Sequence, residues 1–117
     1  MTTVTIYHNP RCSKSRQTLA LLQENGIEPK QVLYLETPPD AATLKALLKK
    51  LGMQAHDLVR HKEPDYKAAG LSKDSKDGDV IAAMVKYPKL IERPIVIKGA
   101  RAKLGRPPEQ VLELFKD

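Results

Sequence analysis

Short runs of β-branched, aromatic and apolar residues recur along the chain and predict strands. Residues 3–7, 31–35 and 94–98 are such runs, and each is bounded by turn-forming residues. Residues 102–104 predict a fourth strand, because Gly99–Ala100 forms a turn that would bring it back antiparallel to the strand before it. The pattern therefore predicts a four-stranded sheet assembled from both ends of the chain.

Apolar residues at helical spacing lie between these runs. A first helix is predicted from residue 12 or 13 to about residue 25, with Leu19 and Leu22 facing inward and Gly26 ending it. A second helix is predicted after Thr37, which we expect to be its cap, with Asp40 completing a capping box. Its inward face is a leucine stripe that ends before Gly52: Leu44, Leu47, Leu48 and Leu51.

Further helices are predicted in the middle of the chain and at its end. Residues 57–60 and 64–69 are two short candidates, and a third carries three inward residues: Val80, Ile81 and Met84. Pro107–Pro108 opens a last helix, with Val111, Leu112 and Phe115 inward. The order is β-α-β, a helical stretch, then β-β-α, which predicts an α/β fold with a mixed sheet.

The composition fits one globular domain. The chain has 117 residues, of which 41% are hydrophobic and 29% charged. It contains no long apolar run and begins without a signal-peptide pattern, so we expect a soluble cytoplasmic protein with no membrane partner.

The net charge of +6 is concentrated in residues 86–106, which hold one acid, Glu92, and seven basic residues: Lys86, Lys89, Arg93, Lys98, Arg101, Lys103 and Arg106. Such a window is either a solvated basic face or an anion site. Nucleic acid is not expected as a partner, because aromatic residues do not alternate with the basic ones.

The single cysteine, Cys12, lies at the start of the first predicted helix. It cannot form an internal disulfide. The unpaired amides and the dipole at a helix start stabilise a thiolate, and Arg11, Lys14 and Arg16 would add to this effect if they faced the sulfur. Cys12 is therefore either an inert side chain or a nucleophile in a C-x-x-S motif. A phosphatase loop is disfavoured, because Thr18 occupies the position at which C-x5-R requires an arginine.

Three arginines are candidates for binding an oxyanion: Arg60, Arg93 and Arg106. Each by itself is more often a surface charge. Arg93 and Arg106 both precede prolines, which restrict their backbones, and the Arg93–Pro94 bond is a candidate cis peptide. His8 is a candidate partner of Cys12. We expect no metal site, because the other histidines, His56 and His61, are isolated in the sequence.

Four separated segments carry a family resemblance: residues 7–16, 34–39, 92–96 and 105–108. In order and spacing they resemble the glutaredoxin-dependent arsenate reductases, and the resemblance covers essentially the whole chain. It implies a single thioredoxin-like domain over residues 1–117, with a helical insertion at about residues 38–90. It also implies Cys12 as the nucleophile and three arsenate-binding residues: Arg60, Arg93 and Arg106. His8, Asn9 and Ser15 would support the thiolate.

The resemblance further implies an activity in arsenic detoxification. Arsenate would be reduced to arsenite through a Cys12 thiol-arsenate adduct, which glutathione as co-substrate and glutaredoxin as partner would resolve, with no bound cofactor. The chain departs from the usual family pattern beside Cys12, where Arg11, Ser13 and Lys14 replace small residues. Two alternatives stay open, namely a monothiol oxidoreductase acting on another substrate and a non-enzymatic protein-interaction regulator.

Overall fold

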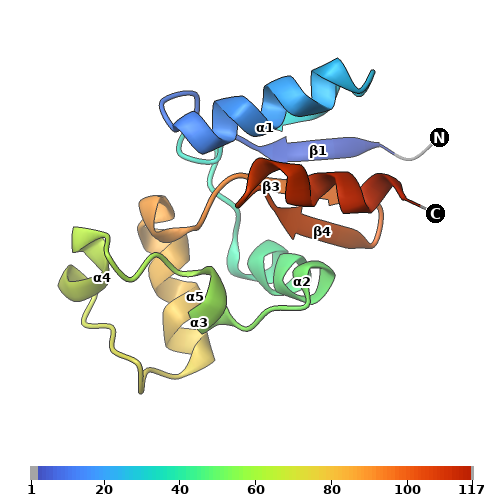
Figure 1. The fold of residues 1–117 in the computed structure, drawn as a ribbon. Helices are drawn as coiled ribbons and strands as arrows, with labels where there is room; N and C mark the ends of the chain where they lie inside the picture. Colours follow the sequence, from blue (N-terminus) through green and yellow to red (C-terminus); the bar gives the residue numbers. More distant parts are fainter. Residues whose placement is uncertain (1–2, 117) are drawn as a thin grey trace. The chain divides into compact units, whose positions relative to one another are not determined.

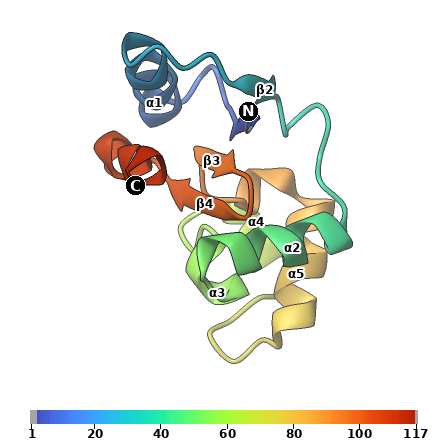
Figure 2. The ribbon, with the colours of Figure 1, turned by 90° about the vertical axis from the view of Figure 1, so that its right-hand side faces the viewer.

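The computed structural model describes residues 3–116, which form two compact units. The first unit combines both ends of the chain, up to Thr37 and from Arg93 onward, and the second comprises Pro38–Glu92. Most elements of the two units are labelled in Figure 1, and β2 is labelled in Figure 2. No helix among the described residues is long and apolar enough to cross a membrane.

The first unit is built on a mixed four-stranded sheet with the order β2-β1-β3-β4. Strand β1 (Val4–Tyr7) runs parallel to β2 (Lys30–Val32) and antiparallel to β3 (Ile95–Lys98), which pairs with β4 (Arg101–Leu104). The α/β class and the mixed sheet predicted from the sequence are confirmed. Because β1 and β2 are parallel, their carboxyl ends lie side by side, where His8 N–H donates to Val32 O at 2.9 Å.

Two helices cover one face of this sheet (Figures 1 and 2). Helix α1 (Ser13–Glu24) contacts the 3₁₀ helix η2 (Pro108–Phe115), which also packs on β4. Their shared core consists of residues that are at most 2% exposed: Ile6, Leu22, Val96, Val111 and Leu114. Burial of this apolar surface is the main force that holds α1, and the residues at its start, against the sheet.

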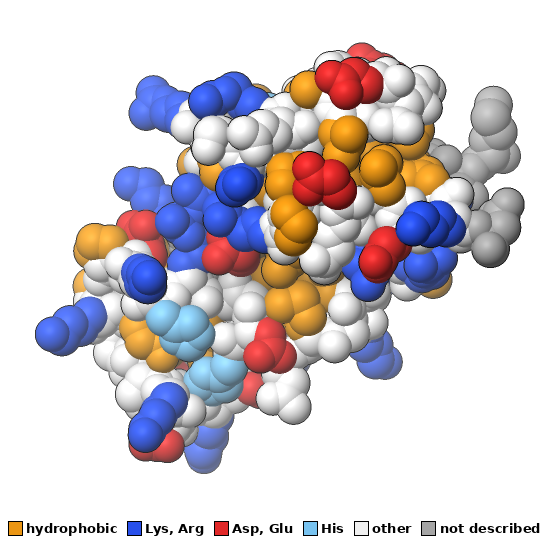
Figure 3. Space-filling view, viewed as in Figure 1, with side chains coloured by type: hydrophobic (Ala, Val, Ile, Leu, Met, Phe, Trp, Pro, Cys, Tyr) orange, Lys and Arg blue, Asp and Glu red, His pale blue; other side chains and the backbone are white. Residues whose placement is uncertain are grey.

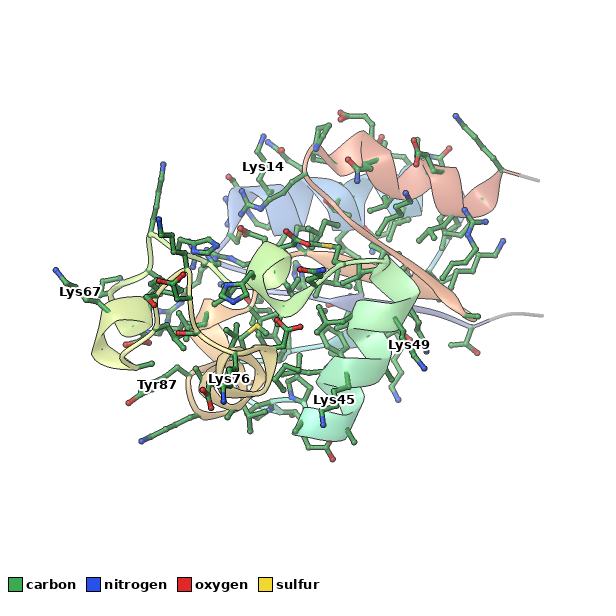
Figure 4. All side chains as sticks on the ribbon, turned by 90° about the horizontal axis from the view of Figure 1, so that it is seen from below. Lys14, Lys45, Lys49, Lys67, Lys76 and Tyr87 are labelled. Carbon is green, nitrogen blue, oxygen red and sulfur yellow. The ribbon has the colours of Figure 1, made fainter. Side chains whose placement is uncertain are left out.

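The second unit is helical. It comprises α2 (Ala41–Leu51), α3 (Ala55–Leu58), α4 (Pro64–Ala68), α5 (Asp77–Lys86) and the 3₁₀ turn η1 (Pro88–Leu90). Helix α5 contacts α2, α3 and η1. The predicted inward residues of both long helices are buried, except Leu51, which is half-buried: Leu44, Leu47, Leu48, Val80, Ile81 and Met84. Lys45 and Lys49 of α2 are exposed (Figure 4).

Two predicted boundaries are wrong because the backbone makes other hydrogen bonds. The second strand ends at Val32, since Leu33 O accepts from the N–H groups of Glu36 and Thr37 and closes a turn over residues 33–37. The short helix predicted at residues 57–60 ends at Leu58, because the next residue, Val59, forms an antiparallel bridge with Ile91.

The predicted cap of α2 is also wrong. Asp40, and not Thr37, is the N-cap, and its carboxylate accepts from Thr43 N–H at 2.8 Å. Proline disfavours helical backbone in the residue before it, so Pro38 and Pro39 delay the start of the helix. Gly52 ends α2 as predicted, with a φ of 68° that a residue with a side chain adopts only at a cost.

The last helix begins close to the predicted residue but is a 3₁₀ helix. With three residues per turn, its buried positions are Pro108, Val111 and Leu114. The predicted inward residues Leu112 and Phe115 are half-buried. The Arg93–Pro94 bond is cis, as predicted, and so is the Arg106–Pro107 bond.

Candidate active site

Cys12 is the N-cap of α1 and terminates the loop that follows β1. The loop is held at both sides of the cysteine, because Cys12 N–H donates to Asn9 O at 3.0 Å and Arg16 N–H donates to Cys12 O at 3.0 Å. The side chain is 9% exposed, so its sulfur lies at the edge of the packed interior. The prediction that the cysteine stands at the start of the first helix is confirmed.

The surroundings of Cys12 lower the pKa of its thiol below the ordinary value of 9.0. Burial acts in the opposite direction and raises the pKa, because it penalises the thiolate. The backbone N–H of Ser15, the charge and hydrogen-bonding capacity of Arg93, and the backbone N–H of Lys14 together outweigh burial. The helix start and one arginine therefore favour the nucleophilic form of the sulfur.

Two of the predicted arginines lie beside this sulfur. Arg106 Nη2 donates to Cys12 Sγ at 3.9 Å, and Arg106 Nε donates to the carbonyl oxygen of Arg93 at 2.8 Å. Arg93 precedes β3 and Arg106 follows β4. Because β3 and β4 pair antiparallel, both arginines lie at the same end of the hairpin, near the start of α1. A thiolate beside two guanidinium groups can both bind an oxyanion and attack its central atom.

Gly105 holds the end of the hairpin against α1. It is buried, its N–H donates to Pro94 O at 2.9 Å, and a Cβ there would lie 2.7 Å from Pro94 Cγ. The Cβ would lie closer still to Thr18 Oγ1 of α1. Only glycine fits this approach, and the residue after it is Arg106. Nothing in the sequence indicated that Gly105 and Thr18 meet, although Gly105 belongs to one of the segments that carry the family resemblance.

His8 and Ser15 form a buried pair behind the loop. His8 Nδ1 and Ser15 Oγ share a hydrogen bond of 2.6 Å, and Asn9 N–H donates to the same hydroxyl at 3.0 Å. Burial, and then the charge of Arg16, lower the pKa of His8 below 6.5, so the imidazole is neutral at neutral pH. The structure thus brings His8, Asn9 and Ser15 together beside Cys12, and their support of the thiolate stays a prediction.

Arg60 lies in the second unit, two residues after α3 ends at Leu58. Arg60 Nη1 pairs with Glu63 Oε2 at 3.2 Å, and Arg60 Nε lies 3.9 Å from Glu92 Oε1. Arg60 Nη1 also donates to Lys89 O at 3.4 Å. Two carboxylates thus hold this guanidinium within its own unit, and its part in the anion site stays a prediction.

Other basic residues surround the start of α1. Arg16 Nη1 donates to Pro10 O at 2.9 Å and thereby braces the loop. Lys14 projects from the first turn of α1 (Figure 4). Lys and Arg side chains gather at the end of the first unit where α1 begins (Figure 3). Residues 3–116 contain no group of three His, Cys, Asp or Glu side chains arranged to hold a metal ion.

Comparison with known proteins shows the family to which this chain belongs. The sequence profile of the ArsC family matches residues 7–114. An "Arsenate reductase" of Neisseria meningitidis serogroup A is 45% identical over 113 residues, which cover 95% of this chain and 97% of that protein. The "Uncharacterized protein YfgD" of Escherichia coli K12 is 62% identical over 113 residues, 95% of each chain.

A solved structure agrees with these sequence relatives. The "Arsenate reductase from Vibrio cholerae" superposes with a TM-score of 0.92 at 51% identity, and the match covers 96% of this chain and 97% of that one. The chain therefore belongs to the ArsC family, and its fold is the thioredoxin-like fold of that family.

Proposed function

We propose that this protein is an oxidoreductase that reduces arsenate to arsenite, with Cys12 as the nucleophile. The observation that carries the proposal is the Cys12 thiol, whose pKa is lowered and whose sulfur lies beside Arg93 and Arg106. Relatives named arsenate reductases at 45–46% identity support the substrate. The activity would serve arsenic detoxification in the cytoplasm.

In the first step the Cys12 thiolate attacks arsenic. An S–As bond forms, an As–O bond breaks, and the departing oxygen leaves as water after protonation, so that arsenic remains As(V). Arg93 and Arg106, joined by Arg60 in this proposal, neutralise the oxyanion and hold arsenic in line with the sulfur. A guanidinium fork suits this task because it donates two parallel hydrogen bonds to one oxyanion.

In the second step an external thiol supplies the remaining electron pair. The glutathione thiolate attacks the Cys12 sulfur, an S–S bond forms, and the S–As pair stays on arsenic, which leaves as As(III) arsenite. A glutaredoxin thiolate then attacks the glutathione sulfur of the mixed disulfide and releases the Cys12 thiolate. Because the chain has one cysteine, it cannot supply the second thiol itself.

The test is arsenate-dependent NADPH oxidation, coupled through glutathione, glutaredoxin and glutathione reductase. Wild-type protein should turn over, and Cys12→Ser should not. Arg93→Lys should weaken the arsenate-dependent step, because a point charge replaces a fork. Full turnover by Cys12→Ser would refute the mechanism, and unchanged arsenate kinetics in Arg93→Lys would remove Arg93 from the site.

The C-x-x-S motif at a helix start also suits a second function, a monothiol oxidoreductase that acts on glutathionylated proteins. Such an enzyme would reduce a glutathione mixed disulfide without any oxyanion present. A folded protein with a titrating Cys12 thiolate, no arsenate turnover and rapid deglutathionylation would favour this function over arsenate reduction.

A further inference from the structure

A cavity opens on the first unit beside the active-site loop. It is lined by the loop before Cys12 on one side and by the turn after β2 on the other: His8, Asn9, Pro10, Arg11, Leu33, Leu35 and Glu36. Cys12 does not line it but follows Arg11 directly in the chain. The function proposed above uses neither the turn nor Arg11.

The positions of both walls follow from the backbone. Parallel pairing of β1 with β2 brings their carboxyl ends together, and the hydrogen bonds to Leu33 O fold the chain back so that Leu35 and Glu36 border the loop. On the other wall, Asn9 Oδ1 accepts from Arg11 N–H at 3.0 Å and fixes the loop backbone. The cavity is therefore part of the architecture that positions Cys12.

The cavity offers one positive charge, one negative charge and an apolar wall. Arg11 and Glu36 are exposed, and within residues 3–116 neither charged group makes a hydrogen bond or an ion pair with another side chain. Leu35 is 40% exposed and is the one large apolar side chain that stands exposed among the residues described. A ligand that carries both charges and a short apolar or thiol segment would match this lining.

We propose that this cavity binds the peptide thiol glutathione and presents it to Cys12, an inference that rests on the proposed function. Glutathione carries two carboxylates, one ammonium group and a central thiol. Arg11 would pair with a carboxylate and Glu36 with the ammonium group, while Leu35 packs against the peptide. A tripeptide extends over roughly 10 Å. The lining residue Arg11 directly precedes Cys12, so the thiol of the bound tripeptide would lie at the end of the cavity nearest Cys12.

Binding is tested with S-methylglutathione, which cannot react, by titration calorimetry. Arg11→Ala and Glu36→Gln should each weaken binding about threefold, as expected for exposed ion pairs, and the double variant about tenfold. Two matched controls remove the same charges outside the cavity in the same unit, Lys30→Ala and Glu24→Gln, and should bind as wild type does. Variants of Arg11 and Glu36 that bind like these controls would overturn the proposal.

Kinetics separate this inference from the proposed function. Arg11→Ala and Glu36→Gln should raise the apparent KM for glutathione, while the KM for arsenate and the rate with uncharged 2-mercaptoethanol stay unchanged. An equal loss with both thiols would show a general defect and overturn the glutathione site. If wild type reduces no arsenate but binds S-methylglutathione with the expected loss in both variants, the proposed function fails and the cavity assignment stands.

Discussion

At the scale of single residues, the thiol of Cys12 experiences opposing effects. Burial raises its pKa, and the Ser15 and Lys14 amides together with Arg93 lower it by more. The sequence could predict the helix start, because Asn9–Pro10 and Gly26 bracket the helix. It could not predict which basic side chain acts on the sulfur. On the sequence, Arg11, Lys14 and Arg16 are the basic residues expected to act on it, but the charge that lowers its pKa is that of Arg93, 81 positions further along the chain.

Replacing Arg93 with glutamine should raise the pKa of Cys12, since both the charge and a donor are lost. The pKa is measured from the pH dependence of the rate at which iodoacetamide alkylates the thiol. Arg101→Gln, which removes a charge from the same hairpin at an exposed site, is the control and should leave the pKa unchanged. A wild-type pKa in Arg93→Gln would show that the helix start alone stabilises the thiolate.

The lowered pKa also predicts how stability depends on pH. Between the folded-state pKa of Cys12 and the ordinary value of 9.0, the unfolded chain binds more protons than the folded one. The contribution of the thiolate to the free energy of unfolding is therefore fully present above pH 9.0. It decreases as the pH falls and is lost below the pKa of Cys12 in the folded protein. Cys12→Ser should lack this gain.

The measurement is urea unfolding of both proteins, in the presence of a reductant, across this pH range. The pKa of His8 is lowered in the folded protein, so His8 also reduces the free energy of unfolding when the pH falls below its ordinary pKa of 6.5. Because His8 is present in both proteins, this effect cancels in the difference between them. A difference between the two proteins that does not grow with pH would contradict the lowered pKa.

At the scale of elements, the strongest periodic patterns were predicted correctly and the connections were not. The leucine face of α2 and the face of α5 with Val80 and Met84 are buried as predicted. Leu33–Leu35 has the composition of a strand, but the pairing of β2 with β1 ends at Val32 and the backbone then turns. The 3₁₀ geometry of η2 depends on its packing against β4 and α1, which composition alone does not contain.

Asp40→Ala should lower the free energy of unfolding, because Thr43 N–H loses its acceptor at the start of α2. Thr37→Ala should have no comparable effect, since Thr37 does not cap the helix. Thermal unfolding of the two variants side by side distinguishes the observed cap from the one predicted by the sequence pattern. A larger loss in Thr37→Ala would contradict the observed cap.

Gly105→Ala should destabilise the protein by about 1–3 kcal/mol, because the new Cβ would lie 2.7 Å from Pro94 Cγ and against Thr18. It should also raise the pKa of Cys12, since relieving the clash moves Arg93 and Arg106, which flank the hairpin. A merely structural role for Gly105 would leave that pKa unchanged. The sequence could not reveal this approach, which exists only once α1 lies against the hairpin.

The control for Gly105→Ala is Gly78→Ala within α5. A Cβ at residue 78 would meet nothing within 4 Å. Replacing glycine by alanine also lowers the entropy that the chain loses when it forms the helix. Gly78→Ala should therefore stabilise the protein by about 0.5–1 kcal/mol. Equal effects of the two substitutions in denaturant unfolding would argue against the tight contact at Gly105.

At the scale of the whole molecule, anion binding should stabilise the fold. In the Cys12→Ser background, which cannot form the adduct, arsenate at about 100 times its dissociation constant should add about 2.7 kcal/mol to the free energy of unfolding. Arg93→Gln in the same background should lose most of this gain. The readout is the shift of the thermal midpoint with arsenate concentration, with chloride at equal ionic strength as the control.

The same titration decides whether the second unit takes part. If Arg60 binds the anion, Arg60→Gln should reduce the arsenate-dependent shift as Arg93→Gln does. A full shift in Arg60→Gln would leave Arg60 as the partner of Glu63 and Glu92 alone. The sequence made Arg60 a candidate by its residue type and by the family resemblance, because, unlike Arg93 and Arg106, it does not precede a proline that would restrict its backbone.

The hairpin has its two arginines at one end and its turn at the other. Arg93 and Arg106 flank the open ends of β3 and β4, while Gly99–Ala100 closes the far end and is exposed. Foreign sequence, such as a fluorescent reporter or an affinity tag, can therefore be grafted between Gly99 and Ala100 at a distance from the sulfur. The same turn is thus a site at which another protein can be fused to this fold while the residues around Cys12 stay unchanged.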